Sequence, residues 1–182
     1  MPNYCSYTMC AVSKDKKKLE RLLKIMNYKD NVYYIYRCFG ADSETDITTT
    51  DNYTGNEPLY KVKIFGDVAW SCYKWFETEE NKQDKVVLRY DGANIIYGNA
   101  HYITLDILCK KLGIGIELFS EEPGCCFQEH YHVNHKGEIL TSDCVEWHEI
   151  WCDNDGNELD EPYTEGGFEY YCDFMNASEI YG

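Results

Sequence analysis

Two stretches of the chain carry apolar residues at positions i, i+3, i+4 and i+7, the stripe of an amphipathic helix. The first set is Leu19, Leu22, Leu23 and Met26, and the second is Leu105, Leu108, Cys109 and Leu112. Ser13 and Thr104 stand where N-caps are expected, and Gly113 occupies the C′ place of the second helix. A third, short helix is predicted over residues 68–76, where apolar side chains again follow helical spacing.

Alternating, β-branched and aromatic residues predict the strands. They are expected over residues 4–12, 31–39, 59–65, 85–90, 114–118, 126–134, 138–151 and 167–174. Lys136-Gly137 reads as the two-residue turn of a hairpin, and Pro123-Gly124 fits the centre of a type II turn. The hairpin register then places His132 opposite Thr141, His130 opposite Asp143, and His148 opposite Cys125.

Helices and strands alternate without the steady spacing of repeated βαβ units. This pattern predicts an α+β fold, in which an antiparallel sheet carries two or three helices on one face. A chain of 182 residues fits one domain with an appendage. We expect a domain over residues 1–152 and an acidic C-terminal β extension over residues 153–182, packed on the same domain or extending it.

The net charge of −15 is distributed unevenly along the chain. The first 40 residues hold eight Lys or Arg against three acidic residues, whereas residues 138–182 hold 13 Asp or Glu and no Lys or Arg. Repulsion of phosphates by the C-terminal half disfavours direct binding to nucleic acid or to an anionic membrane. The charge favours a basic partner, a bound cation, or a solubilising role. The lysines of the first predicted helix are interpreted as its solvated face, with a contact to the protein's own acidic half or to a phosphate as the alternatives.

The acidic C-terminal region interleaves carboxylates with aromatic rings. Such a surface would bind the Lys and Arg side chains that normally contact phosphates, with Tyr rings filling the interface core. Binding of this kind should weaken as salt rises. The predicted partner-binding residues are Asp153, Asp155, Glu158, Asp160, Glu161, Tyr163, Glu165, Glu169, Tyr170 and Asp173.

The ten cysteines are scattered and form no C-x-x-C pair, which argues against a zinc ribbon or a thioredoxin-like site. Reduced, mostly buried thiols are expected instead. No stretch of 18 apolar residues occurs, and the N-terminus lacks the features of a signal peptide. We therefore expect a cytoplasmic protein. No cofactor is predicted.

Four of the five histidines cluster in the predicted hairpin, at positions 130, 132, 135 and 148. His130 and His132 share one strand face, and the expected register adds Asp143 to that face. These three side chains are the candidates for a zinc or iron site, set against ordinary strand histidines on a polar face. No metal is predicted, and a small metal-binding protein or enzyme built on these three residues stays open as the alternative function.

Residues 153–158 (DNDGNE) resemble the start of an EF-hand loop, with oxygen donors at the first, third and fifth places. The resemblance ends at Glu158, where the loop needs Gly, and at Thr164, where it needs Glu. An Asp-Gly turn between strands is the simpler interpretation, with calcium binding to the clustered carboxylates as the alternative.

Carboxylates and a histidine occur close together at Glu121, Glu122, Glu129 and His130, a combination that could serve acid–base catalysis. No nucleophile elbow, P-loop or Gly-rich dinucleotide turn accompanies them. The sequence is therefore interpreted as that of a protein without enzymatic activity.

Three short segments carry a family resemblance. They are Met1–Cys5 (MPNYC), Gly66–Ser71 (GDVAWS) and Ser120–Tyr131 (SEEPGCCFQEHY). Together they resemble YubB-like proteins with a ferredoxin-like domain, which plasmids and phages commonly carry. The resemblance runs from residue 1 to about residue 150 and departs at Cys126, where a small residue is usual. It implies a ferredoxin-like fold and a mobile-element origin, and it supplies no catalytic residues.

Charge and resemblance together lead to one functional hypothesis. The protein would be a phage or mobile-element inhibitor, similar to an anti-CRISPR protein, that blocks the basic groove of a host nucleic-acid-binding defence protein. A CRISPR effector is the leading target and a restriction enzyme the second. The acidic surface would act as a nucleic-acid mimic, and homodimer formation is left open.

Overall fold

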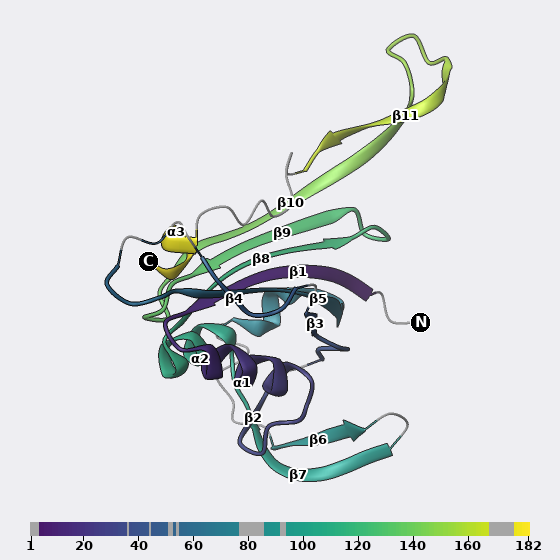
Figure 1. The fold of residues 1–182 in the computed structure, drawn as a ribbon. Coiled ribbons are helices and arrows are strands. Elements are labelled where there is room, and N and C mark those ends of the chain that lie inside the picture. The colour runs from purple at the N-terminus through teal and green to yellow at the C-terminus, as the bar shows by residue number, and fades with distance from the viewer. Residues whose placement is uncertain are drawn as a thin grey trace.

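The computed structural model describes residues 4–35, 37–43, 45–50, 53, 55–76, 86–91, 94–167 and 177–182 (Figure 1). Its main feature is an eight-stranded antiparallel sheet with the order β11-β10-β9-β8-β1-β5-β3, in which β4 also pairs with β5. The strands are β1 (Tyr4–Ser13), β3 (Asp42–Ser43), β4 (Thr48–Thr49), β5 (Tyr60–Ala69), β8 (Ile114–Glu122), β9 (Phe127–Val133), β10 (Ile139–Cys152) and β11 (Glu158–Gly166).

β1 is the central strand of this sheet. It pairs along its whole length with β5, and from Ser6 onward with β8. Its residues alternate between the two faces of the sheet, and both faces are buried over its second half. The predicted strand over residues 4–12 is therefore confirmed.

A second, smaller sheet has the order β2-β7-β6. β2 (Tyr33–Tyr34) pairs in parallel with β7 (Asn94–Tyr102), which forms an antiparallel pair with β6 (Val86–Asp91). The strand predicted over 31–39 is wrong in length, since two of its described residues form a strand and Cys38 makes an isolated bridge to Val68.

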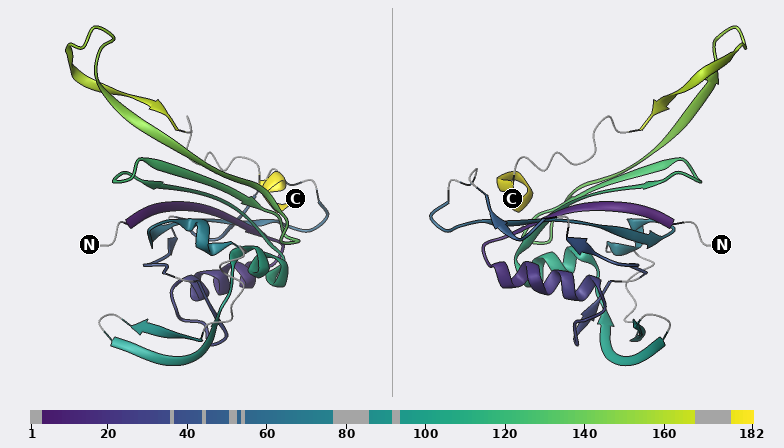
Figure 2. Two further views of the ribbon diagram at one scale, coloured as in Figure 1. Left: turned by 180° about the vertical axis from the view of Figure 1, so that it is seen from behind. Right: turned by 45° about the vertical axis from the view of Figure 1, so that its right-hand side comes forward.

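Two helices cover one face of the main sheet (Figures 1 and 2). They are α1 (Lys16–Met26) and α2 (Leu105–Leu112). Leu19, Leu22, Leu105 and Leu108 are buried in a core shared with the sheet, as their helical spacing predicted. Gly113 ends α2 with φ of 64°, which confirms its predicted place after the helix.

The caps differ from the prediction. Asp15 caps α1 by accepting a 2.9 Å hydrogen bond from the backbone N–H of Lys17, because Ser13 is still part of β1. Thr104 does precede α2, but its side chain makes no cap hydrogen bond.

A third helix, α3 (Ala177–Tyr181), lies on the opposite face of the main sheet (Figure 2). Ala177 and Ile180 pack with Cys10, Val12 and Leu59 in a small core separate from the main one. The close approach depends on Gly115 of β8, since a Cβ there would lie 2.2 Å from the carbonyl oxygen of Ile180.

The predicted ferredoxin-like α+β fold is wrong. Such a fold builds its sheet from strand–helix–strand units, whereas β8, β9, β10 and β11 follow one another through turns and extend one edge of an antiparallel sheet. The described helices are short and lie on both faces, so the protein is predominantly a β structure. The boundary expected after residue 152 falls at the end of β10, and β11 continues the same sheet.

Other local predictions also need correction. The helix expected over 68–76 is a single 3-10 turn, η1 (Cys72–Trp75), because β5 continues to Ala69. The turn after β8 is not a type II turn at Pro123-Gly124, since the positive φ occurs at Cys126 (55°) and not at Gly124. The strand expected over 167–174 lies almost wholly outside the described residues.

Candidate functional site

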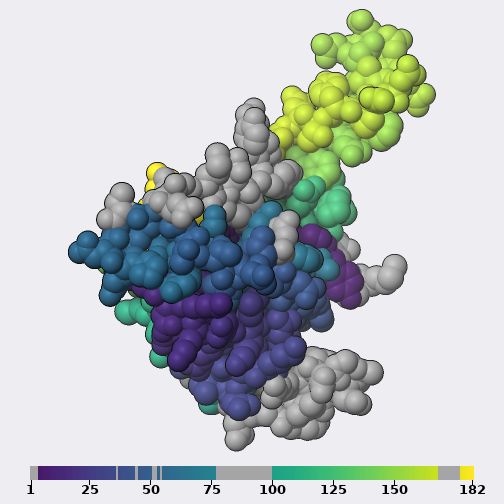
Figure 3. Space-filling view, in the orientation of Figure 1, coloured from purple at the N-terminus to yellow at the C-terminus, as the bar shows by residue number. Residues whose placement is uncertain are grey.

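The hairpin of β10 and β11 extends beyond the rest of the main sheet (Figures 1 and 2). β9 pairs with β10 as far as Glu146, and from Trp147 onward the described partner of β10 is β11. We call residues 146–166 the acidic arm. It appears as a separate projection in the space-filling view (Figure 3).

The arm has a defined strand register. Trp147 lies opposite Gly166, and Ile150 lies opposite Tyr163, with a register shift between Ile150 and Cys152. The root of the arm needs Gly166, which has φ of 83° and whose Cβ would lie 2.7 Å from the carbonyl oxygen of Glu146. Trp147 is buried at this root.

All of the carboxylates of the arm are exposed to solvent. They belong to Glu146, Glu149, Asp153, Asp155, Glu158, Asp160, Glu161 and Glu165, and the arm contains no Lys or Arg. Trp151 and Tyr163 add aromatic surface, with 53% and 51% of each side chain exposed. The arm therefore joins dense negative charge to exposed aromatic rings.

Seven of the ten predicted partner-binding residues lie on this arm. They are Asp153, Asp155, Glu158, Asp160, Glu161, Tyr163 and Glu165. Glu169, Tyr170 and Asp173 lie outside the described residues. Sequence reasoning missed Glu146, Glu149 and Trp151, which β10 contributes to the same hairpin. The sequence has no Lys or Arg after Lys136, and this feature could have extended the predicted acidic surface to these residues.

The Asp153 carboxylate accepts hydrogen bonds from other residues of the turn that joins the two strands of the arm. Its Oδ1 accepts hydrogen bonds from the backbone N–H groups of Asp155 (2.9 Å) and Asn157 (2.8 Å), and its Oδ2 accepts one from Asn157 Nδ2 (2.9 Å). The hydrogen bonds from Asn157 lower the pKa of Asp153 below its usual value. Together with the 3.0 Å hydrogen bond from the N–H of Gly156 to the carbonyl oxygen of Asp153, these contacts form the predicted Asp-Gly turn.

The predicted hairpin register is confirmed for the two strand histidines, because His132 pairs with Thr141 and His130 with Asp143. His148, however, lies opposite Glu165 of β11 and not opposite Cys125.

The hairpin histidines have protein partners. His130 Nε2 lies 3.0 Å from Glu117 Oε1, and the ring stacks on Phe119 with the centroids 4.2 Å apart. His132 Nε2 lies 3.2 Å from the carbonyl oxygen of Ile180 in α3. Within the part of the chain that the structure describes, no group of three or more His, Cys, Asp or Glu side chains is placed to hold a metal ion.

The four residues considered for acid–base chemistry are divided between the two faces of the sheet. Glu129 and His130 are adjacent on β9 and therefore point to opposite faces, as do Glu121 and Glu122 on β8. Glu122 and Glu129 are both buried on the same side of the sheet, where they line a pocket. The histidine is therefore separated from the buried carboxylates.

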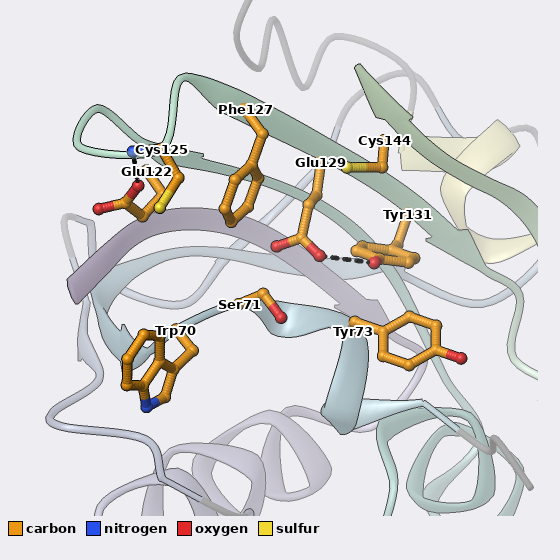
Figure 4. A pocket seen from close by; sticks show the side chains of 9 residues that line it. All are labelled: Trp70, Ser71, Tyr73, Glu122, Cys125, Phe127, Glu129, Tyr131 and Cys144. Atoms are coloured by element: carbon orange, nitrogen blue, oxygen red, sulfur yellow. Dashed lines mark hydrogen bonds between the residues drawn. The ribbon is translucent and has the colours of Figure 1, made fainter. Parts of the chain in front are cut away.

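This pocket has a volume of about 330 Å³ and lies between β9 and the segment that joins β5 to η1 (Figure 4). Its described lining residues are Trp70, Ser71, Tyr73, Glu122, Cys125, Phe127, Glu129, Tyr131 and Cys144. We call it the aromatic pocket. None of these nine residues is basic.

The nine described cysteines are free thiols, and five of them are buried. Burial raises the pKa of the Cys109 thiol well above its usual value, as expected for a thiol that only fills space. Among the described residues, no helix is long and apolar enough to cross a membrane.

Comparisons with protein-family models, with curated proteins and with solved structures find no match to this chain. The resemblance to YubB-like proteins and the mobile-element origin that it implies therefore stay predictions.

Proposed function

We propose that the protein is a non-catalytic inhibitor that places its acidic arm in the basic groove of a nucleic-acid-binding protein. The observation that carries this proposal is the arm itself: eight exposed carboxylates on a projecting two-stranded hairpin without Lys or Arg. A projection of this kind can enter a groove that the body of the protein could not enter.

The dimensions of the arm suit nucleic-acid mimicry. On one face of a β-strand, side chains two residues apart, such as Glu158 and Asp160, lie roughly 6.6 Å apart, which is about two of the 3.4 Å steps between successive phosphates along the axis of one DNA strand. Carboxylates on both strands would then contact Lys and Arg side chains on two sides of the basic groove.

The aromatic residues of the arm supply the apolar part of the interface. Trp151 and Tyr163 are half-exposed, and aromatic residues of this kind commonly contribute most of the binding energy at protein interfaces. Ile150, which pairs with Tyr163, lies beside them and is partly buried. Charge would guide the approach of the partner, and these side chains would stabilise the docked complex.

The target follows from the chemistry of the arm together with the family resemblance. A mobile-element protein with a nucleic-acid-like surface would act on a host defence protein that binds nucleic acid. A CRISPR effector is the first candidate and a restriction enzyme the second.

A pull-down from bacterial host lysate at low and high salt tests the proposal. The wild-type protein should capture a basic nucleic-acid-binding protein at low salt and lose about tenfold or more of it at high salt, because the contact is between charges. The variant Asp160→Lys/Glu161→Lys/Glu165→Lys should lose capture at every salt concentration. The matched control Glu20→Lys/Asp42→Lys/Asp46→Lys, which makes the same charge change at exposed positions off the arm, should retain it.

Two results would contradict the proposal. One is capture, or inhibition of host defence, that survives charge reversal on the arm. The other is an equal loss in the control variant, which would show that net charge alone determines the effect and that the carboxylates serve solubility.

A further inference from the structure

The aromatic pocket brings together two segments that are distant in sequence. Seven of its nine described lining residues come from residues 66–71 and 120–131, two of the three segments that carry the family resemblance. The acidic arm uses none of them. The pocket is therefore a separate feature that the arm does not explain.

The central polar group of the pocket is the Glu129 carboxylate, which is 2% exposed. Its Oε2 accepts hydrogen bonds from the backbone N–H of Cys72 (2.8 Å) and from Ser120 Oγ (2.7 Å). Its Oε1 accepts one from the phenol of Tyr131 (2.8 Å), drawn in Figure 4. Burial and the neighbouring Glu129 raise the pKa of Tyr131, so the phenol keeps its proton and donates. Three donors thus orient the Glu129 side chain.

A second carboxylate lies on the same side of the sheet. Glu122 is 3% exposed and accepts a hydrogen bond from the backbone N–H of Cys125 in the turn after β8. Its cross-strand neighbour on β9 is Phe127, and Glu129 is two residues further along that strand. The pocket therefore carries two buried acidic groups without a basic residue among its described lining residues. A cation taken up from outside would supply these two carboxyl groups with the opposite charge that the described lining residues do not supply.

Aromatic rings form much of the remaining wall of the pocket. Phe127 and Tyr131 extend from the same face of β9 as Glu129, while Trp70 and Tyr73 approach from the opposite wall (Figure 4). Trp70 and Tyr73 are 53% and 49% exposed, so the pocket opens to solvent beside them. The faces of aromatic rings attract cations, and most strongly where water is excluded.

Trp70 is held at the pocket by an uncommon backbone turn. Its φ is 76°, and the N–H of Ser71 donates a 3.1 Å hydrogen bond to the carbonyl oxygen of Ala69, which closes a three-residue turn around Trp70. Positive φ at a bulky residue is rare and costs free energy. Such strain is often found where a side chain must be positioned for a ligand.

We propose that the aromatic pocket binds a small organic cation of the alkyl- or arylammonium class. The ammonium group would lie against the Glu129 and Glu122 carboxylates, and the apolar part of the ligand would pack on the rings of Phe127, Trp70 and Tyr73. The volume of about 330 Å³ is at the lower end of the range for small-molecule sites, which suits a ligand of one ring or a short chain. This site is independent of the acidic arm and of its partner.

Thermal unfolding and calorimetric titration with three probes of one shape test the proposal. The probes are phenethylammonium, the neutral 2-phenylethanol and the anionic phenylacetate. Phenethylammonium at a hundredfold excess over its Kd should raise Tm by roughly 5–10 °C, and the other two probes should not. Glu129→Gln, which keeps the shape of the side chain and removes its charge, should weaken ammonium binding about tenfold or more.

Trp70→Ala provides a second test, because this half-exposed ring can be removed with little risk to the fold. It should weaken ammonium binding about threefold to tenfold. Trp151→Ala is the matched control, since the same ring is removed at the same exposure on the arm, and it should leave binding unchanged. The proposal is overturned if no probe binds, if 2-phenylethanol binds as tightly as phenethylammonium, or if Trp70→Ala and Trp151→Ala bind equally.

Discussion

The phenol of Tyr131 donates a 2.8 Å hydrogen bond to the buried carboxylate of Glu129, two residues earlier on the same strand. Tyr131→Phe removes this donor and leaves the carboxylate with two of its three hydrogen bonds. We expect the free energy of unfolding to fall by about 1–3 kcal/mol, because a buried polar group loses one of its hydrogen-bond partners. Urea unfolding followed by circular dichroism measures the change.

Tyr163→Phe is the control for that measurement. It removes the same hydroxyl from a half-exposed ring on the acidic arm, where water can replace the lost hydrogen bond. Its free energy of unfolding should stay within about 0.5 kcal/mol of wild type. Equal effects of the two variants would show that the Tyr131 hydroxyl does not stabilise Glu129.

Asp30 links the stability of the fold to pH. Its carboxylate accepts hydrogen bonds from Arg21 Nε (3.1 Å) and from the backbone N–H groups of Val32 and Tyr33 (2.9 Å each). Burial opposes ionisation, but these donors outweigh it and lower the pKa of Asp30. A pKa lowered in the folded state stabilises the protein at neutral pH, and this contribution is lost as pH falls below about 4.

Asp30→Asn should therefore lower the free energy of unfolding by about 1–2 kcal/mol at neutral pH. The difference from wild type should shrink as pH falls below about 4, where the wild-type carboxylate takes up a proton. Urea unfolding at neutral and acidic pH tests this, with the exposed Asp46→Asn as the control. A difference that stays constant across this pH range would contradict the assignment.

The strand histidines should act in packing and not in metal binding. His132 Nε2 contacts the carbonyl oxygen of Ile180, so His132→Ala should loosen α3 and cost about 1 kcal/mol. Faster hydrogen–deuterium exchange in residues 177–182 would report this. His148→Ala, on the exposed arm, should leave this exchange unchanged. Zn²⁺ should not raise Tm, and a zinc-dependent rise that is lost in both His132→Ala and Asp143→Ala would contradict this interpretation.

Much of the local structure could be predicted from sequence, because local rules act on adjacent residues. The periodic leucines of α1 and α2 and the stop at Gly113 follow from helix geometry. The predicted two-residue turn at Lys136-Gly137 is wrong in detail: the N–H of Gly137 donates to the carbonyl oxygen of Asn134, so His135 and Lys136 are the central residues and Gly137 follows them with φ of 81°. Next to the turn the β9–β10 register differs from the prediction, since Ile139 pairs with Val133, and a register shift between Ile139 and Thr141 restores the predicted pairing from His132 onward. Errors arose where a longer-range contact determined the outcome: β1 runs on through Ser13 because β5 and β8 still pair there, which moves the cap of α1 to Asp15.

The candidate sites also have some features that could be predicted from sequence and others that only the tertiary structure determines. The acidity of the arm could be recognised from sequence because charge is a property of composition. Its projection could not, since it depends on where β9 stops pairing with β10. The aromatic pocket could not be predicted from sequence either. The path of the chain after Ala69 places Trp70 and Tyr73 against side chains of β9, and no rule of sequence spacing connects segments so far apart.

By itself, the sequence determined the helices α1 and α2, the hairpin of β9 and β10 and the concentration of negative charge, because each depends on neighbouring residues or on composition. Only the tertiary structure decided that the strands form one long antiparallel sheet and that the charge lies on a projecting arm. It alone placed Glu129 among three donors and four aromatic rings. Those arrangements depend on pairing and packing between segments that are distant in the chain, where many alternatives satisfy the same local pattern.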